Sequence, residues 1–142
     1  MRSPTGDNMG AVYVRVRLSN AGDVERVRRG IATMDEVRGC EVEALVDTGA
    51  TRSAVPAKLA ETLGLTIMAQ ASGKLADGSR ASVDICSPIG FEIMGRETFE
   101  EAYVMGDEIL IGQTTLEATD LLVDCKNQRV IGKHPEGPVY RL

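Results

Sequence analysis

The stretch of sequence that decides the fold reads Ala44-Leu45-Val46-Asp47-Thr48-Gly49-Ala50-Thr51. Three apolar residues run directly into an acidic one, as in a strand that enters a core and ends at its edge. A carboxylate at that place costs free energy unless hydrogen bonds satisfy it. Gly49 lets the backbone fold closely beneath the carboxylate, so that amides can point at its oxygens. A plain Asx turn has the same short pattern, but the strand before Asp47 and a helix signal after it favour a functional site.

Segments on both sides of this stretch alternate between apolar and polar residues, which is typical of half-buried strands. We expect strands at 12–18, 41–46, 83–93, 98–105, 109–111, 121–123 and 129–131. A helix is expected from Pro56 to Leu63, because proline suits a first helical turn and Gly64 can end it. The spacing of Thr114 and Glu117 predicts a capping box and a second short helix. Residues 22–39 are interpreted as an insertion of uncertain structure.

Composition excludes several classes of protein. A chain of 142 residues fits one domain, and its net charge of -5 argues against binding of nucleic acid. No apolar run approaches the ~20 residues of a membrane span, and the N-terminal residues lack the apolar segment of a secretory signal. The three scattered cysteines, Cys40, Cys86 and Cys125, form no metal or disulfide pattern. We therefore expect a cytoplasmic protein that binds no metal, cofactor, nucleic acid or membrane.

Leu45-Val46-Asp47-Thr48-Gly49-Ala50, together with Ile109-Leu110-Ile111-Gly112 and a helix signal after it, resembles the retropepsin-like (retroviral-type) aspartic proteases, in particular their small bacterial relatives. The resemblance covers about residues 13–131. It implies a mostly β, single-domain closed barrel with one or two short helices, which forms half of a homodimeric protease. The corresponding domain spans 11–133, between a flexible N-terminus at 1–10 and a C-terminal tail at 134–142.

The resemblance also implies roles for individual residues. Asp47 would be the catalytic carboxylate, and Thr48, Gly49 and Ala50 would form the active-site loop that contacts substrate. Gly112 would lie where the second strand crosses behind that loop. The tip of a flap over the substrate would consist of Ala76, Asp77 and Gly78, where Asp-Gly also gives a strong hairpin-turn signal.

Aspartic proteolysis needs two facing carboxylates that share one proton. The ionised carboxylate takes a proton from water, which attacks the peptide carbonyl, and the protonated one donates to the carbonyl oxygen. The sequence contains no second Asp-Thr-Gly or Asp-Ser-Gly. We therefore predict a two-fold homodimer in which each chain contributes Asp47, and an extended peptide or protein substrate. Val83 and Ile111 are expected to line pockets for apolar side chains.

Two other functions fit parts of the sequence. Asp47-Thr48-Gly49-Ala50-Thr51 superficially matches the phosphate loop of actin-like ATPases, but the chain is too short for that two-lobed fold. The remaining alternative is a catalytically silent dimerisation or peptide-binding module of the same fold. His134, the single histidine, has no serine or cysteine partner in a recognisable catalytic pattern.

Overall fold

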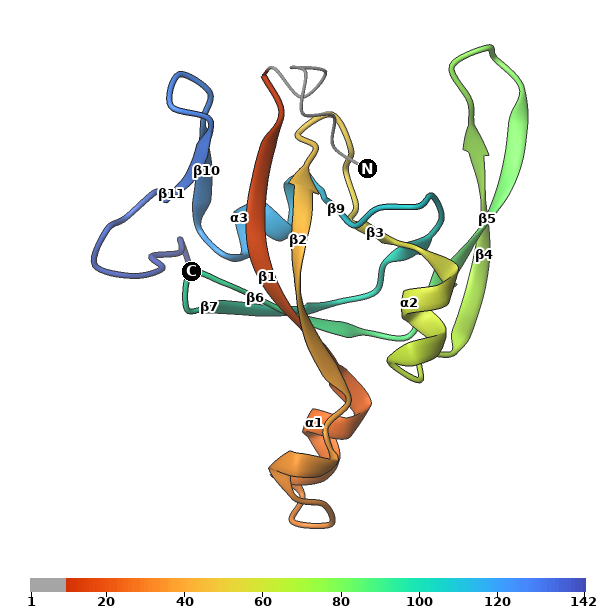
Figure 1. Cartoon of the computed structure of the whole chain (residues 1–142), viewed down its shortest axis with the longest axis vertical. Coiled ribbons are helices and arrows are strands. Elements are labelled where there is room, and N and C mark those ends of the chain that lie inside the picture. The colour runs from red at the N-terminus through yellow and green to blue at the C-terminus, as the bar shows by residue number, and fades with distance from the viewer. Residues whose placement is uncertain (1–9) are drawn as a thin grey trace.

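The computed structural model describes residues 10–142, so the predicted flexible N-terminus lies outside the described residues except for residue 10. Within residues 10–142, eleven strands and four short helices follow one another. Figure 1 shows how they are arranged. In order they are β1 (Val12–Asn20), α1 (Ala21–Arg28), the 3-10 helix η1 (Met34–Glu36), β2 (Gly39–Val46), β3 (Ala54–Val55), α2 (Ala57–Thr62), β4 (Ile67–Lys74), β5 (Arg80–Cys86), β6 (Ile89–Ile93), β7 (Arg96–Glu100), β8 (Tyr103–Val104), β9 (Leu110–Ile111), α3 (Gln113–Ala118), β10 (Leu121–Asp124) and β11 (Arg129–Gly132).

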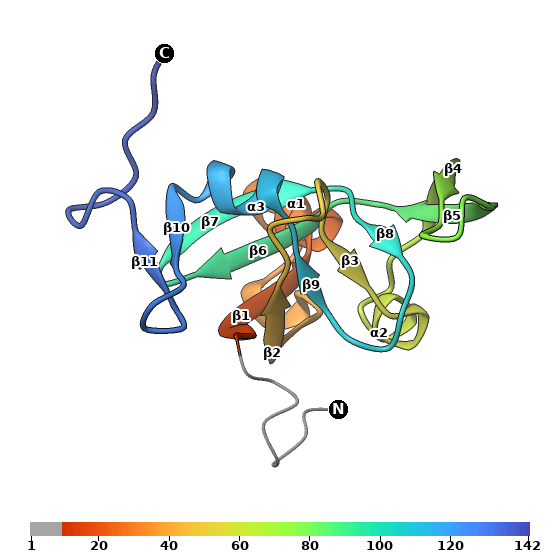
Figure 2. The ribbon, with the colours of Figure 1, turned by 90° about the horizontal axis from the view of Figure 1, so that it is seen from above.

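The protein is mostly β, as predicted. Nine strands form one curled sheet in the order β4-β5-β8-β3-β9-β2-β1-β6-β7, and β10 and β11 form a separate hairpin. The hydrogen-bonded order ends at β4 and at β7 in the described part of the chain, so a closed barrel is not confirmed. Seen from above, the β4–β5 hairpin and the β10–β11 hairpin lie at opposite ends of the molecule (Figure 2).

The alternating pattern of β1 directs one set of side chains into the core. Val16 and Leu18 are fully buried, whereas Arg15 and Arg17, which alternate with them, are exposed. β1 pairs antiparallel with β2 from Val12 to Ser19 and with β6 at its C-terminal end. The buried aliphatic faces of these strands meet Phe91, Ile89 and Ile93 of β6. Such burial contributes roughly 25 cal/mol per Å² of apolar surface removed from water.

The stretch interpreted as an insertion contains α1 and η1. The side chain of Asn20 caps α1 by accepting a hydrogen bond from the amide of Asp23. The guanidinium of Arg38 donates two hydrogen bonds of 2.9 Å to the Asp23 carboxylate, and these bonds link the end of the stretch to its beginning. These bonds lower the pKa of Asp23 against the opposing effect of burial. Arg38 therefore has a structural role in this stretch.

Turns lie where glycine signals predicted them, with differences in detail. Gly78 adopts φ 86 in the β4–β5 turn, which strongly favours glycine, while Asp77 accepts a hydrogen bond from the Ser79 amide at 2.8 Å. The β6–β7 turn uses Met94 and Gly95, both at positive φ. The single strand expected over 98–105 is divided into β7 and β8, which pair with different neighbours. No helix in the described residues is long and apolar enough to cross a membrane.

Candidate active site

Asp47 lies at the point where β2 leaves the sheet. β2 and β9 run parallel, with Leu45 beside Leu110 and Val46 beside Ile111. The amide of Asp47 donates a hydrogen bond of 2.9 Å to the carbonyl of Ile111 and so extends this pairing by one residue. The apolar strand thus fixes the backbone of Asp47, and its side chain is half-buried at the edge of the core.

The loop after Asp47 folds back on the carboxylate. The amide of Gly49 donates to Oδ1 of Asp47 at 3.0 Å, and the amide of Ala50 donates to the Asp47 carbonyl at 3.1 Å. A Cβ on Gly49 would lie 3.3 Å from the same oxygen, so glycine allows this close approach. Thr48 and Gly49 are exposed. One carboxylate oxygen is therefore held by a fixed amide on an accessible loop, as the sequence predicted.

The same loop caps α3. The carbonyl of Ala50 accepts from the amide of Gln113 at 2.8 Å, and the carbonyl of Thr51 accepts from the amide and hydroxyl of Thr114 at 2.9 and 2.7 Å. The first amides of a helix have no partner within it, and here loop carbonyls satisfy two of them. The predicted capping box is wrong for this reason: Gly112 is the N-cap residue, and Thr114 lies inside the first turn.

A chain of buried hydrogen bonds ties Gly112 to the core. Its amide donates to the hydroxyl of Ser53 at 2.9 Å, Ser53 lies 2.5 Å from the hydroxyl of Thr115, and Thr115 donates to Oε1 of Glu100 at 2.8 Å. Each hydroxyl has only one proton to donate. The Thr115 hydroxyl donates its proton to Glu100, so in the bond between Ser53 and Thr115 the Ser53 hydroxyl is the donor. The chain joins the loop after Asp47, α3 and β7.

Gly112 also lies against the loop backbone. A Cβ at this position would approach the carbonyl carbon of Arg52 to 2.7 Å, its oxygen to 2.8 Å and the carbonyl oxygen of Ala50 to 3.0 Å. Real Cβ atoms essentially never come that close to backbone atoms. The structure therefore places Gly112 directly behind the Asp47 loop, and the absence of a side chain is what permits the contact.

The β4–β5 hairpin carries the residues predicted for the flap tip. Ala76, Asp77 and Gly78 are exposed in its turn, and the hydrogen bonds from Ser79 lower the pKa of Asp77. A groove of about 440 Å³ lies between the hairpin and β8, lined among others by Val83, Asp84 and Tyr103. Val83 thus lines a groove, as expected. Ile111 does not, because its side chain is fully buried in the core.

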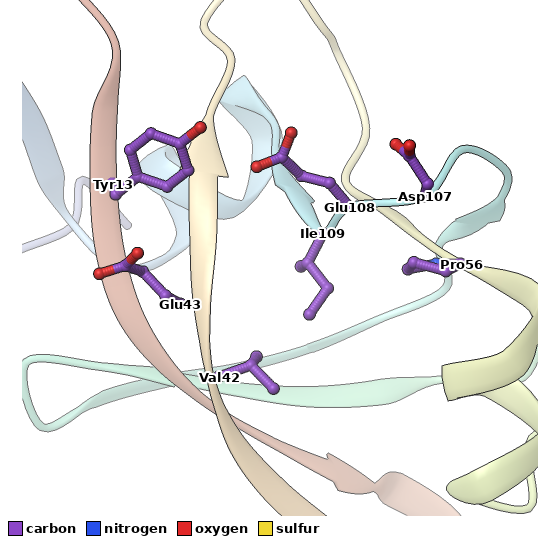
Figure 3. A pocket seen from close by; sticks show the side chains of 7 residues that line it. All are labelled: Tyr13, Val42, Glu43, Pro56, Asp107, Glu108 and Ile109. Atoms are coloured by element: carbon purple, nitrogen blue, oxygen red, sulfur yellow. The ribbon is translucent and has the colours of Figure 1, made fainter. Parts of the chain in front are cut away.

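A second hollow, of about 340 Å³, lies between the β1–β2 pair and the segment before β9 (Figure 3). Its lining residues are Tyr13, Val42, Glu43, Pro56, Asp107, Glu108 and Ile109. The side chains of Asp107 and Glu108 point to one side and that of Ile109 to the other (Figure 3). None of the predicted site residues lines this hollow. In residues 10–142 no group of His, Cys, Asp or Glu side chains could hold a metal ion.

Comparison with known proteins agrees with this geometry. The aspartyl protease family model matches residues 34–112, which is more than half of the chain and includes the Asp47 loop, the β4–β5 hairpin and Gly112. The chain therefore belongs to the aspartyl protease family, and its fold is of the retropepsin-like type. The crystal structure of the retroviral protease-like domain of Ddi1 from Leishmania major is similar, with a TM-score of 0.51 and 17% sequence identity over 84% of this chain and 87% of that one. No curated protein matches the chain.

Sequence reasoning missed three residues next to the site. Ser53 and Thr115 are buried polar side chains, and Arg52 has a buried guanidinium nitrogen. The one available signal was position: Ser53 and Arg52 follow the Asp47 loop directly, and Thr115 follows Gly112 by three residues. The capping-box pattern indicated Thr114 instead, because that pattern considers only residues within one helical turn and not partners distant in the sequence.

Proposed function

We propose that this chain is an endopeptidase that acts as a two-fold homodimer, with Asp47 of each copy in one shared site. Membership of the aspartyl protease family supports the class of reaction. A single chain carries one Asp-Thr-Gly, whereas the chemistry requires two carboxylates. Two copies related by a two-fold axis would meet through the same surface patch, and the exposed loop at Thr48 and Gly49 is available for such a contact.

The observation that carries the proposal is the hydrogen bond from the Gly49 amide to Oδ1 of Asp47. An amide in that position fixes the orientation of the carboxylate. In the dimer one Asp47 would remain ionised and take a proton from the attacking water. The other would be protonated and donate to the carbonyl oxygen of the scissile peptide. The roles then reverse as the proton passes to the leaving amine.

The surroundings of Asp47 fit an extended substrate. In Figure 1 the β4–β5 hairpin rises on the side opposite to the β10–β11 hairpin, and the loop after β2 lies between the two hairpins. The tip of the β4–β5 hairpin at Ala76, Asp77 and Gly78 would act as the flap. The backbone of the hairpin would pair with the peptide as an added strand. The groove beside Val83 and Tyr103 would take substrate side chains.

The test compares wild-type protein with Asp47→Asn on a diverse peptide pool at mildly acid pH. We expect the wild type to cleave and the variant to be inactive while keeping the same melting temperature. Mixing wild type with an excess of the variant should suppress the remaining activity, because mixed dimers have one competent carboxylate. Cleavage that persists in Asp47→Asn removes Asp47 from the mechanism. Peptide binding without cleavage by the wild type favours the silent binding module.

A further inference from the structure

Arg52 lies five residues after Asp47 and stacks over a neighbouring aromatic ring. Its guanidinium carbon is 5.4 Å from the centroid of the Tyr103 ring, within the range of a cation–π contact. The side chain is 36% exposed. Its Nη1 atom, however, is buried and has no hydrogen-bond partner among the described residues. The nearest carboxylate oxygen, Oε1 of Glu101, is 3.9 Å away, which exceeds hydrogen-bond distance.

A buried guanidinium nitrogen without an acceptor is uncommon and costs free energy. Glu101 lowers the electrostatic part of that cost but supplies no hydrogen bond, and its own side chain is 45% exposed. The guanidinium is a planar fork of donors that matches a carboxylate in two parallel hydrogen bonds. Glu101 therefore leaves the charge of Arg52 without a hydrogen-bonded partner, and the exposed part of the side chain, 36% of it, is open to an incoming carboxylate.

The position of Arg52 connects these donors to the groove. Tyr103, on which the guanidinium rests, also lines the groove between the β4–β5 hairpin and β8. The amide of Tyr103 donates to the carbonyl of Ser53 at 3.0 Å, which fixes β8 beside the residue that follows Arg52. Arg52 is not itself a lining residue of the groove. It contacts a residue that is, Tyr103, and it belongs to the chain segment that leads directly from Asp47.

We propose that Arg52 is a specificity-determining residue that selects peptides with an aspartate or glutamate side chain near the scissile bond. This inference rests on the proposed peptidase function. The substrate carboxylate forms hydrogen bonds with the guanidinium that Glu101 does not form, while the aromatic face of Tyr103 holds the guanidinium plane in place. Glu101 competes with the substrate for the same cation.

The experiment uses paired peptides that differ only by Glu or Gln, with the pair placed in turn at each position flanking the cut. For wild type we expect one position at which Glu raises kcat/KM about tenfold or more, mainly through a lower KM, because the carboxylate forms charge-assisted hydrogen bonds with the guanidinium. A tenfold change corresponds to about 1.4 kcal/mol. Arg52→Gln should lose this preference, and Arg52→Glu should prefer Lys at the same position. Glu101→Gln should strengthen the preference for Glu.

The matched control is Arg15→Glu, which reverses the charge of an arginine that is 72% exposed and lies 3.7 Å from Glu41. It should keep the wild-type preference. Arg52→Lys keeps the positive charge but loses the planar fork of donors, and it should retain a weaker preference for Glu. It replaces Arg52→Glu in the test if that variant fails to fold. Cleavage without a preference for Glu at any position, or a preference unchanged in Arg52→Gln, overturns the inference and leaves the proposed function standing. Failure of every form to cleave any peptide overturns the proposed function itself.

Discussion

The hydroxyl of Ser53 lies 2.5 Å from the hydroxyl of Thr115, and the two residues are 62 positions apart in the sequence. This bond is the centre of the buried chain that runs from the Gly112 amide to the Glu100 carboxylate. It joins the loop that carries Asp47 to the helix behind it, so that the site depends on a contact between the two halves of the chain.

Removing either hydroxyl should destabilise the protein. Ser53→Ala leaves the buried Gly112 amide without an acceptor, and Thr115→Val leaves the Ser53 hydroxyl without one, so each should lower the free energy of unfolding by about 1–3 kcal/mol. The double variant should lose less than the sum, because both changes break one network. Urea denaturation measures all three. Thr62→Val, which loses an exposed bond to the Lys58 carbonyl, is the control, and strictly additive losses would contradict the network.

Gly112→Ala should affect both stability and activity. Its methyl group would overlap backbone atoms of Arg52, which cannot move as a side chain tip can. Overpacking of this kind costs about 1–3 kcal/mol, and the resulting shift of the loop would displace Asp47. Gly73→Ala is the control for stability, since its methyl would lie 3.8 Å from the nearest atom. Equal unfolding free energies for Gly112→Ala and wild type would refute the proposed contact.

Gly78→Ala should reduce kcat/KM with little loss of stability. The residue has φ 86 and open space around it, so the substitution strains only the turn of the exposed hairpin, by about 1 kcal/mol. If the hairpin covers substrate, the strained tip closes less readily. Gly30→Ala is a matched control, because Gly30 has φ 75 and open space but lies beyond α1. Equal kinetic effects of the two variants would remove the flap from the mechanism.

Asp120 should make stability depend on pH in acid. Burial raises the pKa of Asp120, but hydrogen bonds from His134 and Val139 and the nearby His134 charge outweigh it, and the pKa lies below 3.8. The stabilisation is therefore present above pH 3.8 and is lost as the pH falls through the folded-state pKa. Asp120→Asn should lower the melting temperature at pH 7, and its difference from wild type should shrink as the pH falls below 3.8. A constant difference across this range would contradict the assignment.

Activity should depend on protein concentration and on pH. Dilution should reduce the specific activity once dimers dissociate, because one chain carries half of the proposed site. The rate should follow a bell-shaped pH profile, since one carboxylate must be ionised and the other protonated. Activity assays and sedimentation at matched concentrations test the first point. A protein that cleaves at full specific activity as a monomer would exclude the shared site.

The sequence predicted local features well where short-range physics determines them. The alternation in β1, the apolar entry to Asp47 and the glycine turn at Gly78 all depend on nearest neighbours, and the structure has each of them. Features that depend on distant partners were not predictable in this way. Thr114 was assigned to a cap because the pattern contains no information about the Thr51 carbonyl, and Ile111 was assigned to a pocket because alternation does not distinguish two buried faces.

The carbonyls of Ala50 and Thr51, which follow Asp47, accept hydrogen bonds from the first two amides of α3. We therefore expect the loop after Asp47 and the first turn of α3 to open together. Amide hydrogens of Gln113 and Thr114 can exchange with solvent only when that segment swings away. Their exchange rates, measured by NMR without any substrate, would therefore report how often the loop that carries Asp47 opens.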